Sequence, residues 1–208
     1  MAGSGSATGR VALDFYATNP ETVKKFLFAL EKDSLVKEIF NDATIWECAC
    51  GNGNIINAVK EYLSKEHIVA DYLASDLINR GCGLVLDFLH TYRKADVIIT
   101  NPPFSLMNEF IKHGLEQTNR FLIFFAKIQL LETKARAELL KNSPLRYIYV
   151  HSERQGTWRN GNPLDENGKP WSTTMCMGWF VWDKKYATGN KGYRSKYRTI
   201  ISIQETND

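Results

Sequence analysis

The tetrapeptide Asn101-Pro102-Pro103-Phe104 combines residue types that can bind and activate a flat amino group. The amino nitrogen of adenine is a poor nucleophile because its lone pair is delocalised into the ring. If the Asn101 side-chain oxygen and the Pro102 carbonyl accepted its two hydrogens, the lone pair would return to the nitrogen. Phe104 could then stack on a base extruded from a duplex. The alternative interpretation is a rigid turn after a buried strand, which two prolines would form in any case.

A glycine-containing loop with Gly51 and Gly53 lies upstream of this tetrapeptide. Glycine at these positions permits a tight turn and a close approach of a ligand to the backbone, and the helix that follows would offer free N–H groups to a carboxylate. Ile56 stands where the dinucleotide-binding pattern has its third glycine, and the sequence lacks the Gly-Lys-Ser/Thr pattern of phosphate-binding loops. A nucleoside cofactor without a pyrophosphate therefore fits this loop better than NAD or ATP.

Two aspartates, Asp76 and Asp87, each follow a further short apolar segment. Asp76 can accept hydrogen bonds from the two hydroxyls of a ribose. Asp87 can accept one from an adenine amino group, while Leu77 or Phe88 packs against the purine face. An aspartate after a strand often only caps a helix, and each signal alone favours that interpretation. Ligands of open α/β sheets bind beyond the carboxyl ends of the strands, so the ordered series ending at Asn101 favours a nucleoside site there.

Short apolar runs alternate with helical patterns along the chain. The expected strands cover residues 45–48, 68–75, 84–86, 97–100, 121–125, 147–150 and 175–182. Helices are expected from Pro20, with Asn19 as N-cap, and over residues 55–63, 106–115 and 129–141. The last of these would bury Leu131, Ala135 and Leu139. Continuous apolar strands separated by helices predict a parallel sheet covered on both faces, and the last two strands, which no helix separates, are predicted to pair antiparallel.

The composition of the 208 residues, 44% hydrophobic and 24% charged, is that of one globular domain. Residues 10–208 are assigned to that domain, and residues 1–9 are interpreted as a disordered lead or a cloning remnant. The sequence has neither a run of about 20 apolar residues for a membrane helix nor a signal-peptide pattern. The cysteines lack the spacing of a disulfide framework or a zinc site, so we expect reduced thiols, no metal and a cytoplasmic location.

Two segments contain residue types that suit contact with nucleic acid. The long connection over residues 151–174 contains Arg154, Trp158 and Arg159. Its tryptophan could stack beside bases or could equally cover the core.

The second segment, residues 184–198, contains six basic residues and no acidic one, with tyrosines interleaved. Such a stripe suits phosphate neutralisation, with Lys191, Arg194 and Lys196 as expected contacts, but a solvated polar loop explains it equally well.

Together these residues resemble the class I S-adenosylmethionine-dependent N6-adenine DNA methyltransferases, in particular the short forms of phages and prophages, from about Leu13 onward. The glycine loop, Asp76 and Asp87 are similar to the cofactor motifs of that family, and the tetrapeptide from Asn101 to its catalytic motif. Phe15-Tyr16-Ala17-Thr18 resembles the N-terminal motif that lines the methionine part of the cofactor, and residues 179–183 resemble a late strand of the short members. The residues implied to contact the cofactor are Tyr16, Ala17, Thr18, Glu47, Cys48, Ala49, Cys50, Gly51, Asn52, Gly53, Asp76, Leu77, Asp87, Phe88 and Asn101.

The resemblance implies S-adenosylmethionine as cofactor, DNA as partner, and direct methyl transfer without a covalent enzyme intermediate or a metal. It also implies an α/β Rossmann-like sheet of seven strands, mostly parallel with a C-terminal antiparallel hairpin. Asn19 stands where the family often has proline. No separate target-recognition domain is expected, so residues 151–174 would have to contact the target.

Other functions remain open. Methyltransferases of guanine N2 in ribosomal RNA and of glutamine in release factors also carry Asn-Pro-Pro followed by an aromatic residue. They usually have an additional N-terminal domain, whereas only about a dozen residues precede the first motif here. A non-catalytic nucleic-acid-binding or inhibitory module could keep the same fold, although the retained Gly51, Asp76 and Asn101 disfavour it.

Overall fold

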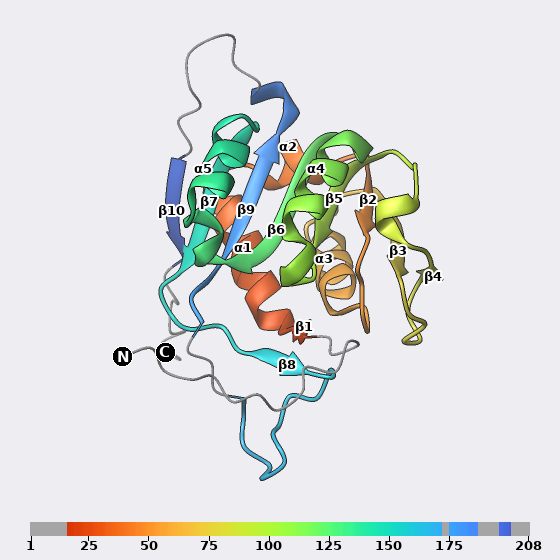
Figure 1. Cartoon of the computed structure of the whole chain (residues 1–208). Helices are drawn as coiled ribbons and strands as arrows, with labels where there is room; N and C mark the ends of the chain where they lie inside the picture. Colours follow the sequence, from red (N-terminus) through yellow and green to blue (C-terminus); the bar gives the residue numbers. More distant parts are fainter. Residues whose placement is uncertain (1–15, 172–174, 187–195, 201–208) are drawn as a thin grey trace.

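The structure is a computed structural model that describes residues 16–171, 175–186 and 196–200, and its centre is one large β-sheet (Figure 1). The sheet has eight strands in the order β10-β7-β9-β6-β5-β2-β3-β4. Strands β1 and β8 form a separate two-stranded sheet. The strands are β1 (Tyr16–Thr18), β2 (Ala43–Glu47), β3 (Ala70–Asp76), β4 (Leu84–Val85), β5 (Ala95–Thr100), β6 (Thr118–Lys127), β7 (Leu145–His151), β8 (Thr157–Arg159), β9 (Met177–Asp183) and β10 (Lys196–Ile200).

Strand direction in the large sheet follows the sequence prediction. Strand β9 runs antiparallel to both of its neighbours, β6 and β7, whereas all other neighbours pair in parallel. The α/β class and the mostly parallel sheet with an antiparallel part are therefore confirmed. The expected number of seven strands is wrong, because β10 adds an eighth strand beside β7.

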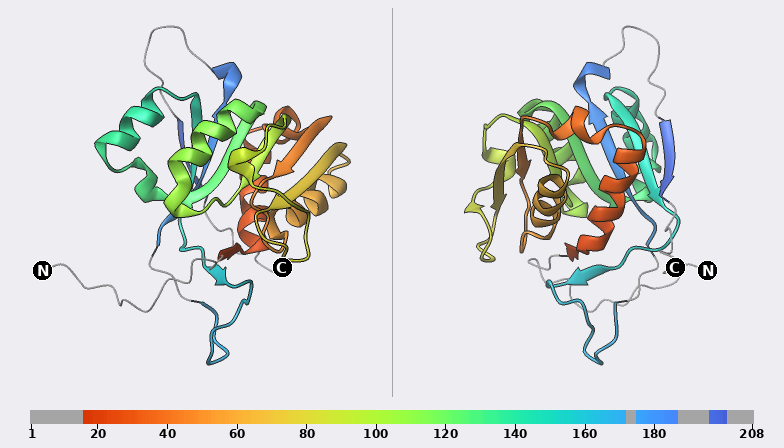
Figure 2. Two further views of the ribbon diagram at one scale, coloured as in Figure 1. Left: turned by 45° about the vertical axis from the view of Figure 1, so that its right-hand side comes forward. Right: turned by 180° about the vertical axis from the view of Figure 1, so that it is seen from behind.

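Helices cover both faces of this sheet (Figures 1 and 2). Neighbouring residues of a strand point to opposite faces, so Ile45 packs with α1, α2 and α3, whereas Trp46 packs with α4 on the other side. Each face thus has its own hydrophobic core, as expected for strands that are apolar throughout. The helices are α1 (Pro20–Lys32), α2 (Val36–Phe40), α3 (Asn54–Lys65), α4 (Met107–Gln117) and α5 (Lys134–Lys141), and the short 3₁₀ turns are η1 (Phe88–His90), η2 (Phe104–Leu106), η3 (Ile128–Leu131) and η4 (Lys184–Tyr186).

Helix α1 begins as the sequence predicts. The Asn19 side chain accepts a hydrogen bond from the Glu21 N–H at 3.0 Å, and Pro20 occupies the first helical position, where a missing N–H costs nothing. This cap fixes where the helix starts, and the helix follows β1 directly. Within the described residues, no helix combines the length and the apolar character that a membrane span requires.

The segment over residues 129–141 is not the single helix that its pattern predicts. It divides into η3 and α5, because Thr133 has a positive φ of 80° and its hydroxyl caps α5 by accepting the Arg136 N–H at 3.4 Å. The predicted buried stripe is shifted as well: Ala135 is exposed, and Leu140 is the buried side chain of α5. The break places α5 beyond the carboxyl end of β6.

Candidate active site at the carboxyl ends of the strands

The glycine loop joins the carboxyl end of β2 to α3. Gly51 and Gly53 both have positive φ, 54° and 81°, which a side chain would strain. A Cβ on Gly53 would also lie only 2.5 Å from the Cys82 sulfur. Gly53 is the N-cap of α3 and has no side chain to cap the helix, so the side-chain acceptor for the first turn comes from elsewhere: Glu47 accepts the Ile56 N–H. Several N–H groups of the loop have acceptors within the protein: Gly51 donates to Asp76 and Gly53 to the Cys50 carbonyl. The predicted binding of a ligand carboxylate at the start of α3 stays a prediction.

Asp76 lies beside this loop at the end of β3. One carboxylate oxygen accepts the Gly51 N–H at 2.8 Å, and the other accepts the Ile78 N–H at 3.0 Å. A carboxylate can accept about four hydrogen bonds, so each oxygen retains capacity for a hydroxyl. Asp76 thus holds the glycine loop in place while remaining able to bind a vicinal diol.

Glu47 is not on the surface of the loop but beneath it. Its side chain is 1% exposed, and it accepts the Ile56 N–H at 2.8 Å, inside the first turn of α3. Burial raises the pKa of the Glu47 carboxyl well above its ordinary range, although the hydrogen bond from Ile56 opposes this shift. The predicted contact between Glu47 and a cofactor therefore gives way to a supporting role under the loop.

The remaining loop residues divide by burial. Cys48 and Cys50 are buried free thiols, and the Cys50 sulfur donates to the Cys82 carbonyl at 3.3 Å. They pack as small buried residues, whereas Ala49 and Asn52 are partly exposed on the loop. Among the described residues, no group of His, Cys, Asp and Glu side chains is arranged to hold a metal ion.

The residues after β4 agree with the prediction only in part. The Asp87 carboxylate caps η1 by accepting the Leu89 N–H at 3.0 Å, and it lies 2.7 Å from the His90 ring nitrogen. Phe88 is 3% exposed and packs against Trp46 in the core, so its predicted packing against a purine is wrong. Leu77, which follows Asp76 at the end of β3, is 63% exposed and therefore open to a ligand.

The Asn101 amide at the end of β5 has a defined orientation. Its Nδ2 donates to the Tyr16 carbonyl at 3.1 Å and to the Thr18 hydroxyl at 3.2 Å. Because a carbonyl can only accept, the NH₂ half of the amide must face β1. The Oδ1 atom therefore faces away from β1, and in the described part of the chain it accepts no hydrogen bond.

Strand β1 connects the predicted motifs physically, which the sequence does not reveal. Besides holding Asn101, it is bound by α3, because the Asn54 amide donates to the Thr18 carbonyl at 2.9 Å. On its other side β1 pairs antiparallel with β8, with Thr18 opposite Thr157 and Ala17 opposite Trp158. Strand β8, which belongs to the long connection after β7, is therefore paired with the same strand that holds the Asn101 amide. Figure 1 shows β1 beside β8.

The rest of the tetrapeptide forms a turn that is anchored to the glycine loop. The Thr100 hydroxyl donates to the Ala49 carbonyl at 3.3 Å, so the ends of β2 and β5 are tied together. Pro102 is buried, Pro103 is exposed, and Phe104 is partly exposed at the start of η2. The Lys127 ammonium lies 4.3 Å from the centre of the Phe104 ring. The structure therefore places the tetrapeptide beside the glycine loop and Asp76.

The residues predicted to contact nucleic acid do not all lie near Asn101. Arg154 and Arg159 are exposed and Trp158 is partly buried, all on the segment that leads into or forms β8. Lys196 begins β10 opposite Tyr147, at the amino end of β7 and thus at the far end of the sheet. Lys191 and Arg194 lie outside the described residues.

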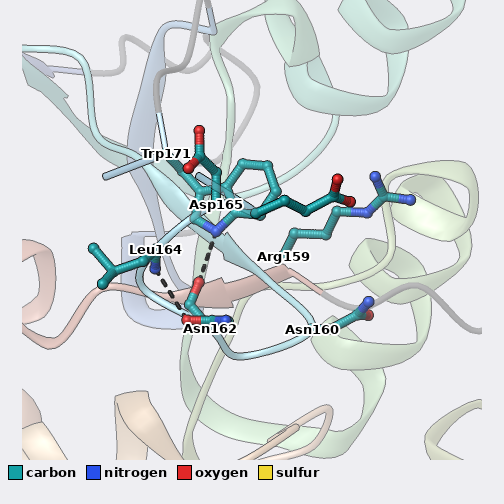
Figure 3. A pocket seen from close by; sticks show the side chains of 7 residues that line it. Arg159, Asn160, Asn162, Leu164, Asp165 and Trp171 are labelled. Carbon is teal, nitrogen blue, oxygen red and sulfur yellow. Dashed lines mark hydrogen bonds between the residues drawn. The ribbon is translucent and has the colours of Figure 1, made fainter. Parts of the chain in front are cut away.

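A pocket of about 340 Å³ lies within the long connection (Figure 3). The Trp171 indole N–H donates to the Asn162 carbonyl at 2.7 Å, and Leu164 bridges to Pro170, which closes a hairpin after β8. Sequence reasoning missed this hairpin, although Asn160-Gly161 and Asn167-Gly168 are turn signals that predict one. The pocket shares only Arg159 with the predicted site residues, so it is a feature of the connection and not of the glycine loop.

Comparison with known proteins identifies the fold. No family model matches the sequence, and no curated protein shows significant sequence similarity. Solved structures do match: a protein assigned as a class I S-adenosylmethionine-dependent methyltransferase from Listeria monocytogenes has a TM-score of 0.59 at 15% identity, over 91% of this chain and 67% of that one. The M protein of the type I restriction enzyme EcoKI (EC 2.1.1.72) has a TM-score of 0.55 at 12% identity, over 81% and 44%. A protein assigned as an RNA methyltransferase from Pyrococcus horikoshii has a TM-score of 0.55 at 11% identity, over 87% and 93%.

These TM-scores show a fold similar to that of class I methyltransferases, and at identities of 11–15% the likeness concerns the fold alone. The chain spans less than half the length of the EcoKI protein.

Proposed function

We propose that this protein is an S-adenosylmethionine-dependent methyltransferase that modifies the N6 amino group of adenine in DNA. The observation that carries the proposal is the orientation of the Asn101 amide, whose NH₂ group is fixed by Tyr16 and Thr18 so that Oδ1 is available as an acceptor. The fold supports it, because solved structures with the same fold include the EcoKI M protein, an adenine-N6 DNA methyltransferase.

The described residues fit the cofactor. The positive φ values at Gly51 and Gly53 leave a cradle without Cβ atoms, and the amino end of α3, whose N-cap Gly53 has no side chain, would suit the carboxylate of a methionine group. Asp76 has capacity for the two ribose hydroxyls, and Leu77 offers apolar surface to the adenine ring. When bound, S-adenosylmethionine would supply a methyl group on a positively charged sulfur; on transfer the charge would pass to the acceptor nitrogen, which would become neutral by losing one proton to solvent.

The acceptor side of the reaction depends on the tetrapeptide. Asn101 Oδ1 and the Pro102 carbonyl would accept the two hydrogens of the adenine amino group, which returns the lone pair to the nitrogen before attack. A neutral asparagine suffices for this role because the reaction moves a positive charge without creating a new one. Phe104 would stack on the extruded base, and the prolines keep both acceptors in fixed positions.

The test is a comparison of methyl acceptors. The purified protein is incubated with S-adenosylmethionine labelled in the methyl group, together with DNA, tRNA, ribosomal RNA or release factor in separate reactions. We expect label in DNA, recovered as N6-methyldeoxyadenosine. Label in RNA or release factor but not in DNA would overturn the DNA assignment. Calorimetric titration with S-adenosylhomocysteine is the companion measurement, and no binding at high micromolar concentration would favour a non-catalytic module.

A further inference from the structure

We propose that the pocket in the hairpin after β8 binds a second base of the DNA substrate, close in the same strand to the adenine that accepts the methyl group. This inference rests on the proposed function, because it names a further contact between the same site and its substrate. Residues 151–174 are expected to contact the target, and the pocket gives this contact a defined ligand and a defined position.

The hairpin, residues 160–171, is held in a fixed place relative to the core. Before it, the buried Thr22 hydroxyl of α1 donates to the side-chain oxygen of Gln155 at 2.7 Å. After it, the backbone returns to the same point, because a Cβ on Gly156 would lie only 3.1 Å from the Trp171 carbonyl oxygen. Figures 1 and 2 show the hairpin beyond β8, on the side of the large sheet where the parallel strands end.

The direction of the side chains places the pocket on the same face of the β1–β8 sheet as Asn101. The Thr18 hydroxyl, which accepts from Asn101 Nδ2, points to that face, and Thr157 lies opposite Thr18. Neighbouring side chains of a strand alternate, so Arg159 points to this face as well, whereas Trp158 points to the other. Arg159 also lines the pocket. The pocket and the Asn101 amide are therefore reached from one side.

The pocket wall combines an aromatic surface with donors and acceptors (Figure 3). Its volume of about 340 Å³ lies in the usual range for small-ligand sites, about 300–1,000 Å³. Trp171 is partly exposed, and its indole N–H is fixed on the Asn162 carbonyl. Within the described part of the chain, Trp171 belongs to neither hydrophobic core, so its ring forms part of the wall. The polar side chains of the lining include Arg159, Asn160, Asp165 and Glu166.

The charges of the lining suit a neutral base and disfavour a phosphate. Two carboxylates, Asp165 and Glu166, would repel an anion. Asp165 is engaged in the turn, where one oxygen accepts the N–H groups of Asn167 and Lys169 at 2.8 and 2.9 Å. Glu166 is exposed. A base is flat and neutral, and its edges carry both donors and acceptors, so it can stack on Trp171 while a carboxylate or an amide pairs with an edge.

The position of the pocket suits a base of the strand that carries the acceptor adenine. The Tyr16 carbonyl accepts from Asn101 Nδ2, and Tyr16 lies opposite Arg159, so the pocket wall begins on the strand next to the one that holds Asn101. An adenine that is extruded toward Asn101 leaves its neighbour without a stacking partner. The ring of Trp171 can replace that partner.

The test compares the sequence contexts of methylation. DNA of mixed sequence is treated with S-adenosylmethionine and either wild type or a variant, and long-read sequencing reports the bases around each N6-methyladenine. Wild type should prefer particular bases at a position near the acceptor. Trp171→Ala should lose this preference and raise KM for DNA about tenfold, because base–aromatic stacking contributes about this much to affinity. The single-turnover rate and the affinity for S-adenosylhomocysteine should match those of wild type.

Matched variants separate base binding from a structural role of Trp171, which also closes the hairpin. Glu166→Gln keeps the size of an exposed side chain but adds a donor, so it should change which base is preferred at that position. Lys169→Gln removes an exposed charge of the hairpin that does not line the pocket and should keep the wild-type preference.

Two results would overturn the inference in different ways. If wild type methylates adenine in DNA, and both Trp171→Ala and Glu166→Gln keep its KM and its base preferences, the pocket does not bind a base and the proposed function stands. A wild-type protein that methylates no adenine in DNA would overturn both.

Discussion

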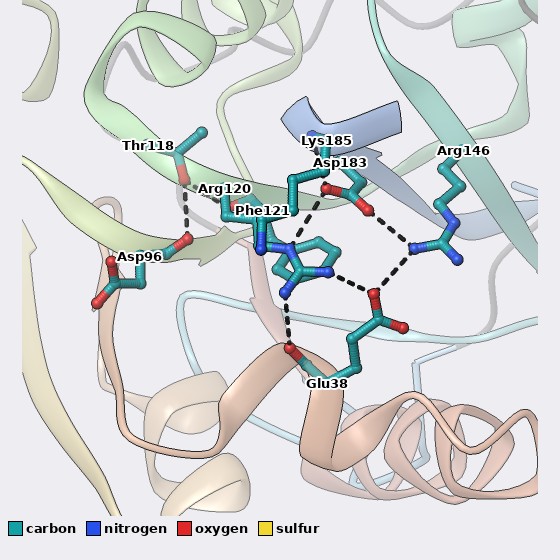
Figure 4. Close-up of polar contacts among 8 residues, drawn as sticks. All are labelled: Glu38, Asp96, Thr118, Arg120, Phe121, Arg146, Asp183 and Lys185. Carbon is teal, nitrogen blue, oxygen red and sulfur yellow. Dashed lines mark hydrogen bonds and ion pairs between the residues drawn. The ribbon is translucent and has the colours of Figure 1, made fainter. Parts of the chain in front are cut away.

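At the edge of the sheet where the parallel strands β6 and β7 begin and the antiparallel strand β9 ends, charged groups neutralise one another. The Asp183 carboxylate is 2% exposed, accepts from Arg146 at 2.8 Å and from the Lys185 N–H at 3.0 Å, and lies 3.5 Å from the Arg120 guanidinium. Glu38 contacts both arginines (Figure 4). A buried carboxylate is tolerated there because cations and N–H groups surround it.

At the carboxyl ends, polar groups are held in place but keep some of their capacity. Asp76 accepts one N–H at each oxygen, and Asn101 uses only its NH₂ half. The partners that fix them belong mainly to the backbone: N–H groups donate to Asp76, and the Tyr16 carbonyl accepts from Asn101, so the groups are oriented without being neutralised. The amino end therefore contributes stability, whereas the carboxyl end holds oriented acceptors that keep unused capacity.

The largest effect is expected for Asn101→Ala. It removes an acceptor used when the nitrogen attacks, so methyl transfer should fall by about 10²–10³-fold, while affinity for S-adenosylhomocysteine stays within a few fold. Single-turnover rates and calorimetry measure the two quantities. Asn119→Ala is the matched control, since Asn119 is exposed at the amino end and its amide donates to Asp96. An equal loss of transfer and cofactor affinity in Asn101→Ala would refute the role of this residue.

Asp183→Ala should lower the stability of the fold and leave the rate of methyl transfer unchanged. Removal of the buried carboxylate leaves the Arg146 and Arg120 guanidinium groups without their central partner, and we expect a loss of about 3 kcal/mol in the free energy of unfolding. Urea titration gives this value. At temperatures where the variant is folded, its transfer rate should equal that of wild type. A stable variant with lost transfer would show that the two ends are not independent.

Asp76→Ala should weaken S-adenosylhomocysteine binding by about 10–100-fold, because a carboxylate that binds a diol and also fixes Gly51 is lost. The transfer rate at saturating cofactor should fall much less. Asp71→Ala, an exposed position earlier on β3, serves as control. Unchanged cofactor affinity in Asp76→Ala would mean that the ribose lies elsewhere.

Thr18→Val tests whether the orientation of the Asn101 amide matters. It keeps the side-chain shape but removes the hydroxyl that accepts from Nδ2, so we expect about a tenfold lower transfer rate with unchanged S-adenosylhomocysteine affinity. Thr18→Ser should retain the wild-type rate. A parallel drop in cofactor affinity would assign Thr18 to the cofactor alone.

The smallest effect concerns pH and a buried histidine at the end of β7. Burial, aided by the positive charge of Lys25 and opposed by Glu153, lowers the pKa of His151 to about 4. The unfolded chain takes up this proton near pH 6.5 and the folded chain does not, so stability falls as pH decreases from about 7 toward 4. Between about pH 7 and 5.5 the loss should be about 1 kcal/mol. His151→Gln, which can still accept from Trp179, should reduce this pH dependence; an unchanged pH profile would contradict the assignment.

The sequence predicts those parts of the site that depend on strand ends. Runs of apolar residues locate β2, β3 and β5, so the positions of Gly51, Asp76 and Asn101 at one edge follow from general rules of α/β sheets. These rules do not predict which individual side chains are buried. Phe88 lies after an aspartate just as Leu77 does, yet one fills the core and the other is exposed.

The sequence also does not predict pairing between short segments that lie far apart along the chain. Strands β1 and β8 have three residues each, which is too short for a periodic pattern, and their pairing depends on how the rest of the chain is folded. The orientation of Asn101 depends on β1 and therefore could not be predicted. The break before α5 could not be predicted either, because the positive φ of Thr133 interrupts the helical spacing of Leu131, Ala135 and Leu139.

The most direct test of the central claim is nucleoside mass spectrometry of DNA from cells that lack adenine methylation of their own. Cells expressing wild type should contain N6-methyldeoxyadenosine, and cells expressing equal amounts of folded Asn101→Ala should contain almost none. A wild-type protein that binds S-adenosylhomocysteine but leaves DNA without this nucleoside, or that yields a methylated cytosine instead, would contradict the account.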